Sequence, residues 1–246
     1  AHLPVIRNKD HSKMSKRKND VSILSHRDKG YLPEAINNFL ALMGWSHPEK
    51  NEIFSLDEFL KLFTLERITL TAPVYDIEKL NWLNGMYIRE MDDAELTKRL
   101  TPFIPQDCPP EMVPQILPLI KERLVTLKDF EELTTFFYRD ISVDQAMLAK
   151  KSTTEEVKTQ LEATKSALES LDEKNWTVEF IEQQIRSLAE TNGWKPGQYF
   201  MLLRIAVTGK TATPPLFETM QVLGREKVLS RLNPSYISED KADKIN

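Results

Sequence analysis

Most of this sequence places its apolar residues at the spacing of an α-helix, whereas the alternation typical of β-strands is scarce. Proline and glycine mark where such helices begin and end. Residues 34–43 follow Pro33 and are stopped by Gly44, and residues 177–192 are stopped by Gly193. A chain of 246 residues is long enough to bury a core in one or two domains. The chain is therefore predicted to fold as a mainly helical protein.

The positions of the helices follow from the same pattern. The expected helices cover residues 33–43, 55–63, 76–84, 92–100, 111–123, 126–138, most of 142–175, 177–192, 196–208, 214–223 and 225–232. A capping box, Thr153 with Glu156, supports one of these helix starts. Pro114 and Pro118 predict a kink in the helix over 111–123, or a later start of it, because proline removes a donor and clashes with the preceding turn.

The charge of the chain is unevenly distributed. The formal net charge is −4, which argues against indiscriminate binding of nucleic acid by bulk electrostatics. Residues 1–30 nevertheless hold eight lysines and arginines against three aspartates, a local balance of +5 that leaves −9 for the remainder. A basic segment on an acidic body is typical of a protein that contacts phosphate at chosen places. An unstructured basic tail is the alternative, which the strongly patterned residues that follow disfavour.

Composition excludes several classes of protein. The single Cys108 rules out an internal disulfide framework and leaves no thiolate cluster for zinc. The histidines at positions 2, 11, 26 and 47 lack close ligand spacing, so no metal site is predicted. No stretch approaches the roughly 18 apolar residues that a membrane span requires, and no signal peptide is recognisable. We therefore expect a cytoplasmic protein that does not enter the membrane.

A short cationic segment, Lys13-Met14-Ser15-Lys16-Arg17, lies near the beginning of the chain. Lysine ammonium groups on a mobile loop suit a polyphosphate, because compact point charges can follow negative charge as it develops. A short basic run can equally be solvated surface, so its meaning depends on the sequence around it.

With this context the sequence resembles bacterial-type glutamyl-tRNA synthetases, which are class I aminoacyl-tRNA synthetases. The resemblance covers nearly the whole chain in order, and only residues 146–175 carry little of it. The residues that carry it are His2-Leu3-Pro4, the KMSKR-type segment at 13–17, Gly30-Tyr31-Leu32-Pro33-Glu34-Ala35, Gly44-Trp45-Ser46, Phe63-Thr64-Leu65-Glu66-Arg67, Asp76-Ile77-Glu78-Lys79-Leu80, Leu203-Arg204-Ile205-Ala206-Val207-Thr208-Gly209 and Pro214-Pro215-Leu216-Phe217-Glu218.

The resemblance implies three parts. Residues 1–88 resemble the KMSKR loop and the stem-contact fold, a mixed α/β unit with little strand. Residues 89–138 and 139–246 resemble the two subdomains of an all-helical anticodon-binding domain, the second of them ending in a polar tail. The family's catalytic Rossmann fold, with its His-Ile-Gly-His motif, is absent from the sequence. We therefore expect the second half of a synthetase, which does not charge tRNA alone.

The resemblance also implies roles for the cationic loop. Lys16 is the main phosphate-binding catalytic lysine, and Lys13 assists it. Met14 and Ser15 supply backbone contacts to ATP, whereas Arg17 pins the loop or meets RNA. ATP with its usual Mg²⁺ and the glutamate substrate belong to the whole enzyme. Neither ATP nor Mg²⁺ is expected to be bound by this half alone, because the rest of the ATP site lies in the absent half. The glutamate pocket lies there as well.

Anticodon contacts are implied at Arg204, Thr213, Pro214 and Leu216, near the junction of the helices over 196–208 and 214–223. Arg204 lies among apolar neighbours, so a structural ion pair is an alternative interpretation of it. Arg123 matches the family arginine that is associated with reading the third anticodon base, cytosine in glutamate tRNAs and guanine in glutamine tRNAs. It could instead be a cation in the last turn of its helix.

The sequence thus predicts the stem-contact and anticodon-binding part of a glutamate–tRNA ligase, with tRNA(Glu) as its partner and a monomeric state. A non-catalytic RNA- or protein-binding module derived from such a synthetase is the alternative. The dipeptide Gly209-Lys210 followed by Thr211 is not a phosphate-binding P-loop, because Arg204 stands where the first glycine of that motif is required.

Overall fold

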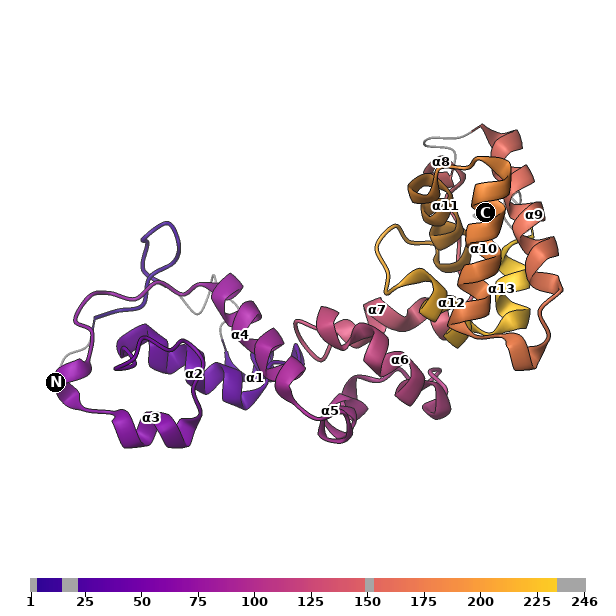
Figure 1. Cartoon of the computed structure of the whole chain (residues 1–246). Coiled ribbons are helices and arrows are strands. Elements are labelled where there is room, and N and C mark those ends of the chain that lie inside the picture. Colours follow the sequence, from indigo (N-terminus) through magenta and orange to yellow (C-terminus); the bar gives the residue numbers. More distant parts are fainter. Residues whose placement is uncertain (1–3, 15–21, 149–152, 234–246) are drawn as a thin grey trace, which may run out of the picture. The chain divides into compact units, whose positions relative to one another are not determined.

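The computed structural model describes residues 4–14, 22–148 and 153–233 (Figure 1). Helices dominate these ranges, which confirms the prediction of a mainly helical chain. The same ranges contain no strand, only isolated bridges that pair Arg7 with Lys13, Arg7 with Val74, and Trp45 with Ile68. The mixed α/β character expected for residues 1–88 is therefore limited to these bridges among the residues described. No helix in the described ranges combines the length and apolar character that a membrane crossing requires.

The chain forms two compact units. The first comprises Ala1–Gln106 and Ile120–Glu132, and the second comprises Asp107–Leu119 and Leu133–Asn246. The division predicted from the sequence, with boundaries after residues 88 and 138, stays a prediction.

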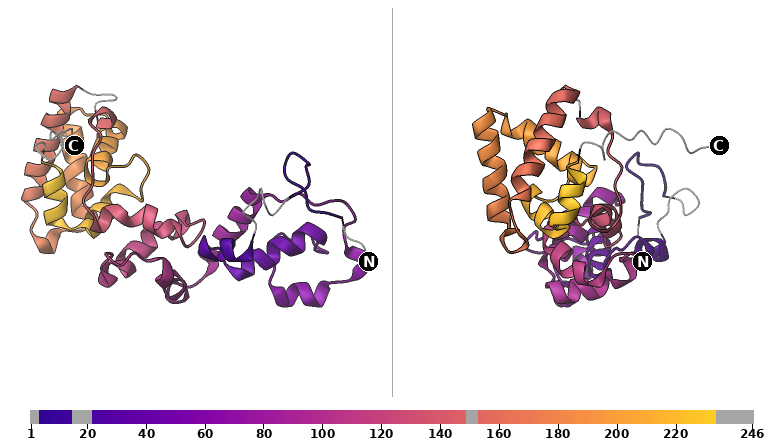
Figure 2. Two further views of the ribbon diagram at one scale, coloured as in Figure 1. Left: turned by 180° about the vertical axis from the view of Figure 1, so that it is seen from behind. Right: turned by 90° about the vertical axis from the view of Figure 1, so that its right-hand side faces the viewer.

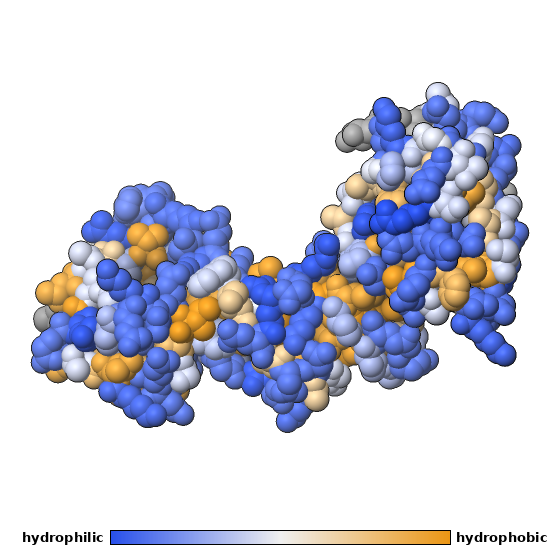
Figure 3. All heavy atoms as spheres, viewed as in Figure 1, coloured by the Kyte–Doolittle hydropathy of each residue, from blue (hydrophilic) through white to orange (hydrophobic). Residues whose placement is uncertain are grey.

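The first unit is organised around a pair of helices, α2 and α4, that pack against each other. Its helices are α1 (Ile23–Asp28), α2 (Pro33–Gly44), α3 (Leu56–Leu62), η1 (Leu65–Arg67), α4 (Ile77–Glu90), α5 (Asp93–Leu100), η2 (Thr101–Phe103) and η4 (Lys121–Arg123). Between α2 and α4 lies a buried cluster of Tyr31, Phe39, Leu80 and Leu83. The apolar spacing that predicted these helices thus builds this core. Figure 3 shows that hydrophobic side chains also reach the surface of this unit. Leu56 and Leu60 on α3 are two exposed leucines of the unit.

The second unit is a bundle of helices that Figure 2 shows from two further sides. Its helices are η3 (Pro110–Met112), α6 (Val113–Ile120), α7 (Asp129–Tyr138), α8 (Gln145–Leu148), α9 (Thr154–Glu169), η6 (Glu173–Asn175), α10 (Val178–Asn192), α11 (Pro196–Thr208), α12 (Leu216–Leu223) and α13 (Arg225–Arg231), with α6 and α7 contributing residues to both units. α10 packs against α9, α11 and α12. The α-helix expected over residues 111–123 begins at Val113. This agrees with the later start that Pro114 and Pro118 predicted. The capping box of Thr153 and Glu156 is also present and starts α9.

Candidate nucleic-acid interface

Arg204 anchors the loop that joins α11 to α12. Its Nη1 donates to the carbonyl oxygens of Pro214 (2.7 Å) and Thr213 (3.3 Å), and also to the hydroxyl of Thr213. Hydrogen bonds from a charged donor are stronger than neutral ones, so one side chain fixes two consecutive residues of the loop. These acceptors all belong to the loop itself. Arg204 therefore orders the loop, whether or not it also contacts a ligand.

The start of the same loop is fixed by the end of α11. Gly209 caps this helix with φ +70°, a conformation that glycine adopts without strain. The hydroxyl of Thr208 donates to the carbonyl of Arg204 (2.6 Å), and the amide of Lys210 donates to that hydroxyl (3.2 Å). Buried Arg231 donates to the carbonyl of Val207 at 2.6 Å. Gly209 therefore closes a helix, whereas the glycines of a phosphate loop lie before the helix that they serve.

The structure brings four of the predicted anticodon contacts together. Thr213, Pro214 and Leu216 have buried side chains, and Arg204 is partly exposed above them. Pro215 at the N-cap of α12 is exposed and makes no side-chain cap hydrogen bond. The loop is therefore held by its buried side chains and by Arg204, which itself stays partly exposed.

Replacing Arg204 with methionine is expected to lower the free energy of unfolding of the second unit by about 2 kcal/mol, because buried acceptors lose a charged donor. Hydrogen-exchange mass spectrometry should show faster exchange in peptides covering residues 209–215. Lys195→Met is the matched control, since it removes an exposed cation just before the same helix. Equal exchange in the Arg204 variant and the unmodified protein would contradict the anchoring role.

Arg123 lies in the first unit, at the end of the short helix η4. The turn after it is built by Asp129, whose Oδ2 accepts from the amides of Val125 (3.0 Å) and Thr126 (2.7 Å). The hydroxyl of Thr126 donates to Asp129 Oδ1 at 3.0 Å. This pairing explains the Thr-x-x-Asp spacing of the segment. Arg123 itself is exposed, and its side chain forms no hydrogen bond or ion pair with another residue in the described part of the chain.

Two residues that the sequence reasoning missed hold this turn. Asn84 on α4 is fully buried; its Oδ1 accepts from the amide of Leu32 (2.8 Å) and its Nδ2 donates to the carbonyl of Val125 (2.5 Å). The carbonyl of Gly30 accepts from the amide of Leu127 at 3.0 Å. The signal for Asn84 was present in the sequence, because this polar residue interrupts the apolar stripe of its helix.

The segment before the KMSKR-type loop is tied to the rest of the first unit. Lys9 Nζ lies 3.0 Å from both Asp76 Oδ1 and Glu78 Oε2, and its hydrogen bond lowers the pKa of Asp76 below the ordinary value. The amide of Met14 donates to the carbonyl of Ile6 at 3.1 Å, and Lys13 is exposed beside it. Ser15, Lys16 and Arg17 lie outside the described residues. Among the residues described, no group of three metal-ligating side chains occurs.

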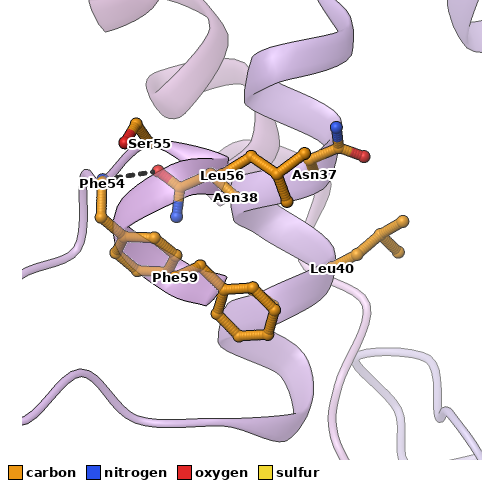
Figure 4. A pocket seen from close by; sticks show the side chains of 8 residues that line it. Asn37, Asn38, Leu40, Phe54, Ser55, Leu56 and Phe59 are labelled. Carbon is orange, nitrogen blue, oxygen red and sulfur yellow. Dashed lines mark hydrogen bonds between the residues drawn. The ribbon is translucent and has the colours of Figure 1, made fainter. Parts of the chain in front are cut away.

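A separate groove of about 320 Å³ lies between α2 and the segment leading into α3 (Figure 4). One of its polar side chains, Asn38, already has partners within the fold: Nδ2 donates to the carbonyl of Glu52 (3.1 Å), and Oδ1 accepts from the amide of Phe54 (3.2 Å) and the hydroxyl of Tyr87 (3.0 Å). The remaining lining includes Leu40, Leu56 and Phe59. The buried amide of Asn38 therefore serves the fold, and the other polar lining residues, Asn37 and Ser55, are not titratable groups.

Comparison with known families decides the relationship. Residues 95–235, which include Arg123 and the Arg204 loop, match the family model described as anticodon binding domain. The chain belongs to this family. Residues 1–82 match the model for the catalytic domain of class I tRNA synthetases (E and Q). The chain therefore corresponds to a carboxyl-terminal portion of such an enzyme, in which the end of the catalytic domain precedes the anticodon-binding domain.

Individual relatives agree with the family. A glutamate–tRNA ligase of Dehalococcoides mccartyi strain BAV1 is 41% identical over 242 residues, covering 94% of this chain and 49% of the relative. One from Acidothermus cellulolyticus is 39% identical, with 94% and 48% covered. The crystal structure of a glutamate tRNA ligase from Elizabethkingia meningosepticum matches with a TM-score of 0.84 at 27% identity, covering 98% of this chain and 51% of that one. The chain thus spans about half the length of the relatives it matches.

Proposed function

We propose that this chain is the tRNA-recognition part of a glutamate–tRNA ligase and that it binds tRNA(Glu) through the anticodon loop. The observation that carries the proposal is that one anticodon-binding family match, over residues 95–235, includes both the Arg204 loop and the exposed Arg123. Arginine offers a rigid fork of donors for unpaired base edges, which is how unstacked anticodon bases are read. Residues 1–88 would then form the stem-contact fold, and residues 89–138 and 139–246 the two anticodon-binding subdomains of a monomer.

The whole enzyme would join glutamate to its tRNA with ATP and Mg²⁺. Lys16, assisted by Lys13, would stabilise the departing pyrophosphate, while Met14 and Ser15 would contact ATP through their backbone. The physical need is clear, because negative charge grows on the leaving group as the α-phosphorus is attacked. The anchored segment ahead of the loop supports this proposal, since the Lys9 ion pairs with Asp76 and Glu78 hold the start of the loop.

Within this proposal Arg123 and the Arg204 loop contact different parts of the anticodon. Arg204, Thr213, Pro214 and Leu216 would contact the anticodon, and Arg204 would also shape the loop that meets it. Arg123 would read the third base. Its donors can pair with the carbonyl oxygen of cytosine, whereas guanine at that place would present a donor edge. Its exposure, and the absence of side-chain partners for it among the residues described, support this role.

The test is binding of the chain to labelled tRNA(Glu), measured by fluorescence anisotropy, beside a copy whose third anticodon base is changed from C to G. The base change is expected to cost about 2 kcal/mol, roughly a 30-fold loss in affinity. Arg123→Ala should bring the two affinities together. Lys128→Ala is the matched control, because Lys128 is an exposed cation in the same turn, and it should leave the discrimination intact. Equal binding of both tRNAs by the unmodified chain would remove Arg123 from this role, and no saturable binding would contradict the proposed function itself.

A further inference from the structure

An arginine outside the predicted site lies within cation–π distance of two aromatic rings. Arg186 on α10 places its guanidinium carbon 5.3 Å from the ring centre of Phe200 on α11 and 5.8 Å from that of Phe217 on α12. The two rings meet edge to face, with their centres 5.6 Å apart. A cation over aromatic faces is attracted by their negative charge density. Three helices thus converge on one guanidinium group.

This guanidinium forms the outer surface of the cluster. The Arg186 side chain is 53% exposed, whereas Phe217 beneath it is 9% exposed. Glu182, one turn earlier on α10, accepts from Nε at 2.6 Å and lies 2.6 Å from Nη2. The group is therefore held by the two rings and by Glu182, while about half of the side-chain surface stays open to solvent.

The position of this cluster connects it to the candidate site. Phe200 lies one helical turn before Arg204 on α11, and Phe217 directly follows Leu216 at the start of α12. Arg186 therefore contacts two side chains that lie within four residues of predicted anticodon contacts. An exposed ion pair at i,i+4 stabilises a helix by only about 0.3–0.5 kcal/mol, so stability alone is a weak reason for this arrangement.

We propose that the outer face of the Arg186 guanidinium is a stacking platform for an unpaired base of bound RNA. The inference rests on the proposed function. Unstacked bases pack on guanidinium planes as they do on aromatic rings. Because Glu182 and the two phenylalanine rings already hold the side chain, little conformational entropy remains to be lost when a base packs on it. A phosphate is the poorer ligand, since it would approach a cation whose charge is already balanced by Glu182. A base is uncharged, so the carboxylate of Glu182 does not repel it as it would repel a phosphate.

The experiment measures binding of a fluorescent anticodon stem-loop RNA with the glutamate anticodon, and of copies that each lack one loop base at an abasic nucleotide. Arg186→Ala and Arg186→Lys should both weaken binding of the complete RNA by about tenfold, because lysine keeps the charge and loses the plane. For one abasic RNA both variants and the unmodified chain should bind alike, since the stacked base is gone. Lys158→Ala, an exposed cation on α9, should bind every RNA as the unmodified chain does.

The outcomes separate the two proposals. Full affinity in Arg186→Lys would overturn stacking and indicate a contact through charge alone. A loss of equal size for every abasic RNA would also overturn it, because no base would then be coupled to Arg186. Failure of the unmodified chain to bind the complete RNA would overturn both the stacking proposal and the proposed function. Thermal unfolding followed by circular dichroism shows that each variant is folded, and Arg186→Lys, which keeps the ion pair with Glu182, carries the test if the alanine variant unfolds.

Discussion

Replacing Gly30 with alanine is expected to lower the free energy of unfolding of the first unit by about 3 kcal/mol or more. Gly30 has φ +80°, a left-handed conformation that strains any residue with a side chain. A Cβ added there would lie 2.7 Å from the amide nitrogen of Lys128 and 2.8 Å from that of Leu127. Both neighbours are backbone atoms of the turn that follows Arg123, so the clash can be relieved only by moving that turn. Hydrogen-exchange mass spectrometry measures the effect, because it follows peptides of this unit separately.

The matched control is Gly44→Ala at the last residue of α2 in the same unit. A Cβ at Gly44 meets nothing within 4 Å, and its φ is not positive. This substitution should be neutral or stabilise the unit by up to about 1 kcal/mol, because alanine has fewer unfolded conformations than glycine. If Gly30→Ala exchanged as slowly as Gly44→Ala, the close approach of Gly30 to the turn would be contradicted.

Local pattern was sufficient to predict most of the helices. Pro33 starts α2 and Gly44 ends it, while Gly193 caps α10 in a left-handed conformation, as the sequence indicated. These features depend on interactions within a few residues, namely a fixed proline φ, a glycine free to adopt positive φ, and an apolar stripe at a spacing of 3.6 residues. The same kind of information does not extend to partners that lie far apart in the chain.

The contacts that shape the candidate site are of this distant kind. Asn84 joins residues 32 and 125, and Gly30 meets the turn at residues 127–128. Periodicity marks Asn84 as unusual on its helix without naming its partners. The grouping of Arg204 with Thr213 and Pro214 was reached by resemblance, because a helix and the loop after it can meet in several ways. The hydrogen bonds that order the loop became visible only in the structure.

The two arginines that the sequence singled out have different surroundings. Arg204 donates to the backbone of its loop, whereas the Arg123 side chain has no hydrogen-bond or ion-pair partner among the residues described. A donor already used by the fold shapes a surface, and a donor without a partner is available to a ligand. Substitution of Arg204 should therefore affect stability and binding together, while substitution of Arg123 should affect discrimination between bases with little change in stability.

Asn84→Leu is expected to lower the free energy of unfolding of the first unit by about 3 kcal/mol. Leucine has a similar size and fills the buried site, but it can neither accept from the amide of Leu32 nor donate to the carbonyl of Val125. The Leu32 amide is buried and would lose its partner, and an unpaired buried backbone donor costs about 1–3 kcal/mol. The carbonyl of Val125 also loses its hydrogen bond from Asn84, so the turn that follows Arg123 should become mobile. Peptides covering residues 121–130 should then exchange faster, and discrimination between C and G at the third anticodon base should fall.

Asn37→Leu provides the comparison, because Asn37 on α2 is exposed and its side chain makes no hydrogen bond with another residue in the described ranges. It undergoes the same chemical change and should leave both stability and discrimination unchanged. Asn84→Leu would thus reduce discrimination without touching RNA, whereas Arg123→Ala would reduce it at full stability. If Asn84→Leu lowered stability and left discrimination intact, the amide of Asn84 would serve the core alone. Loss of both would show that one buried side chain supports the fold and the presentation of Arg123 together.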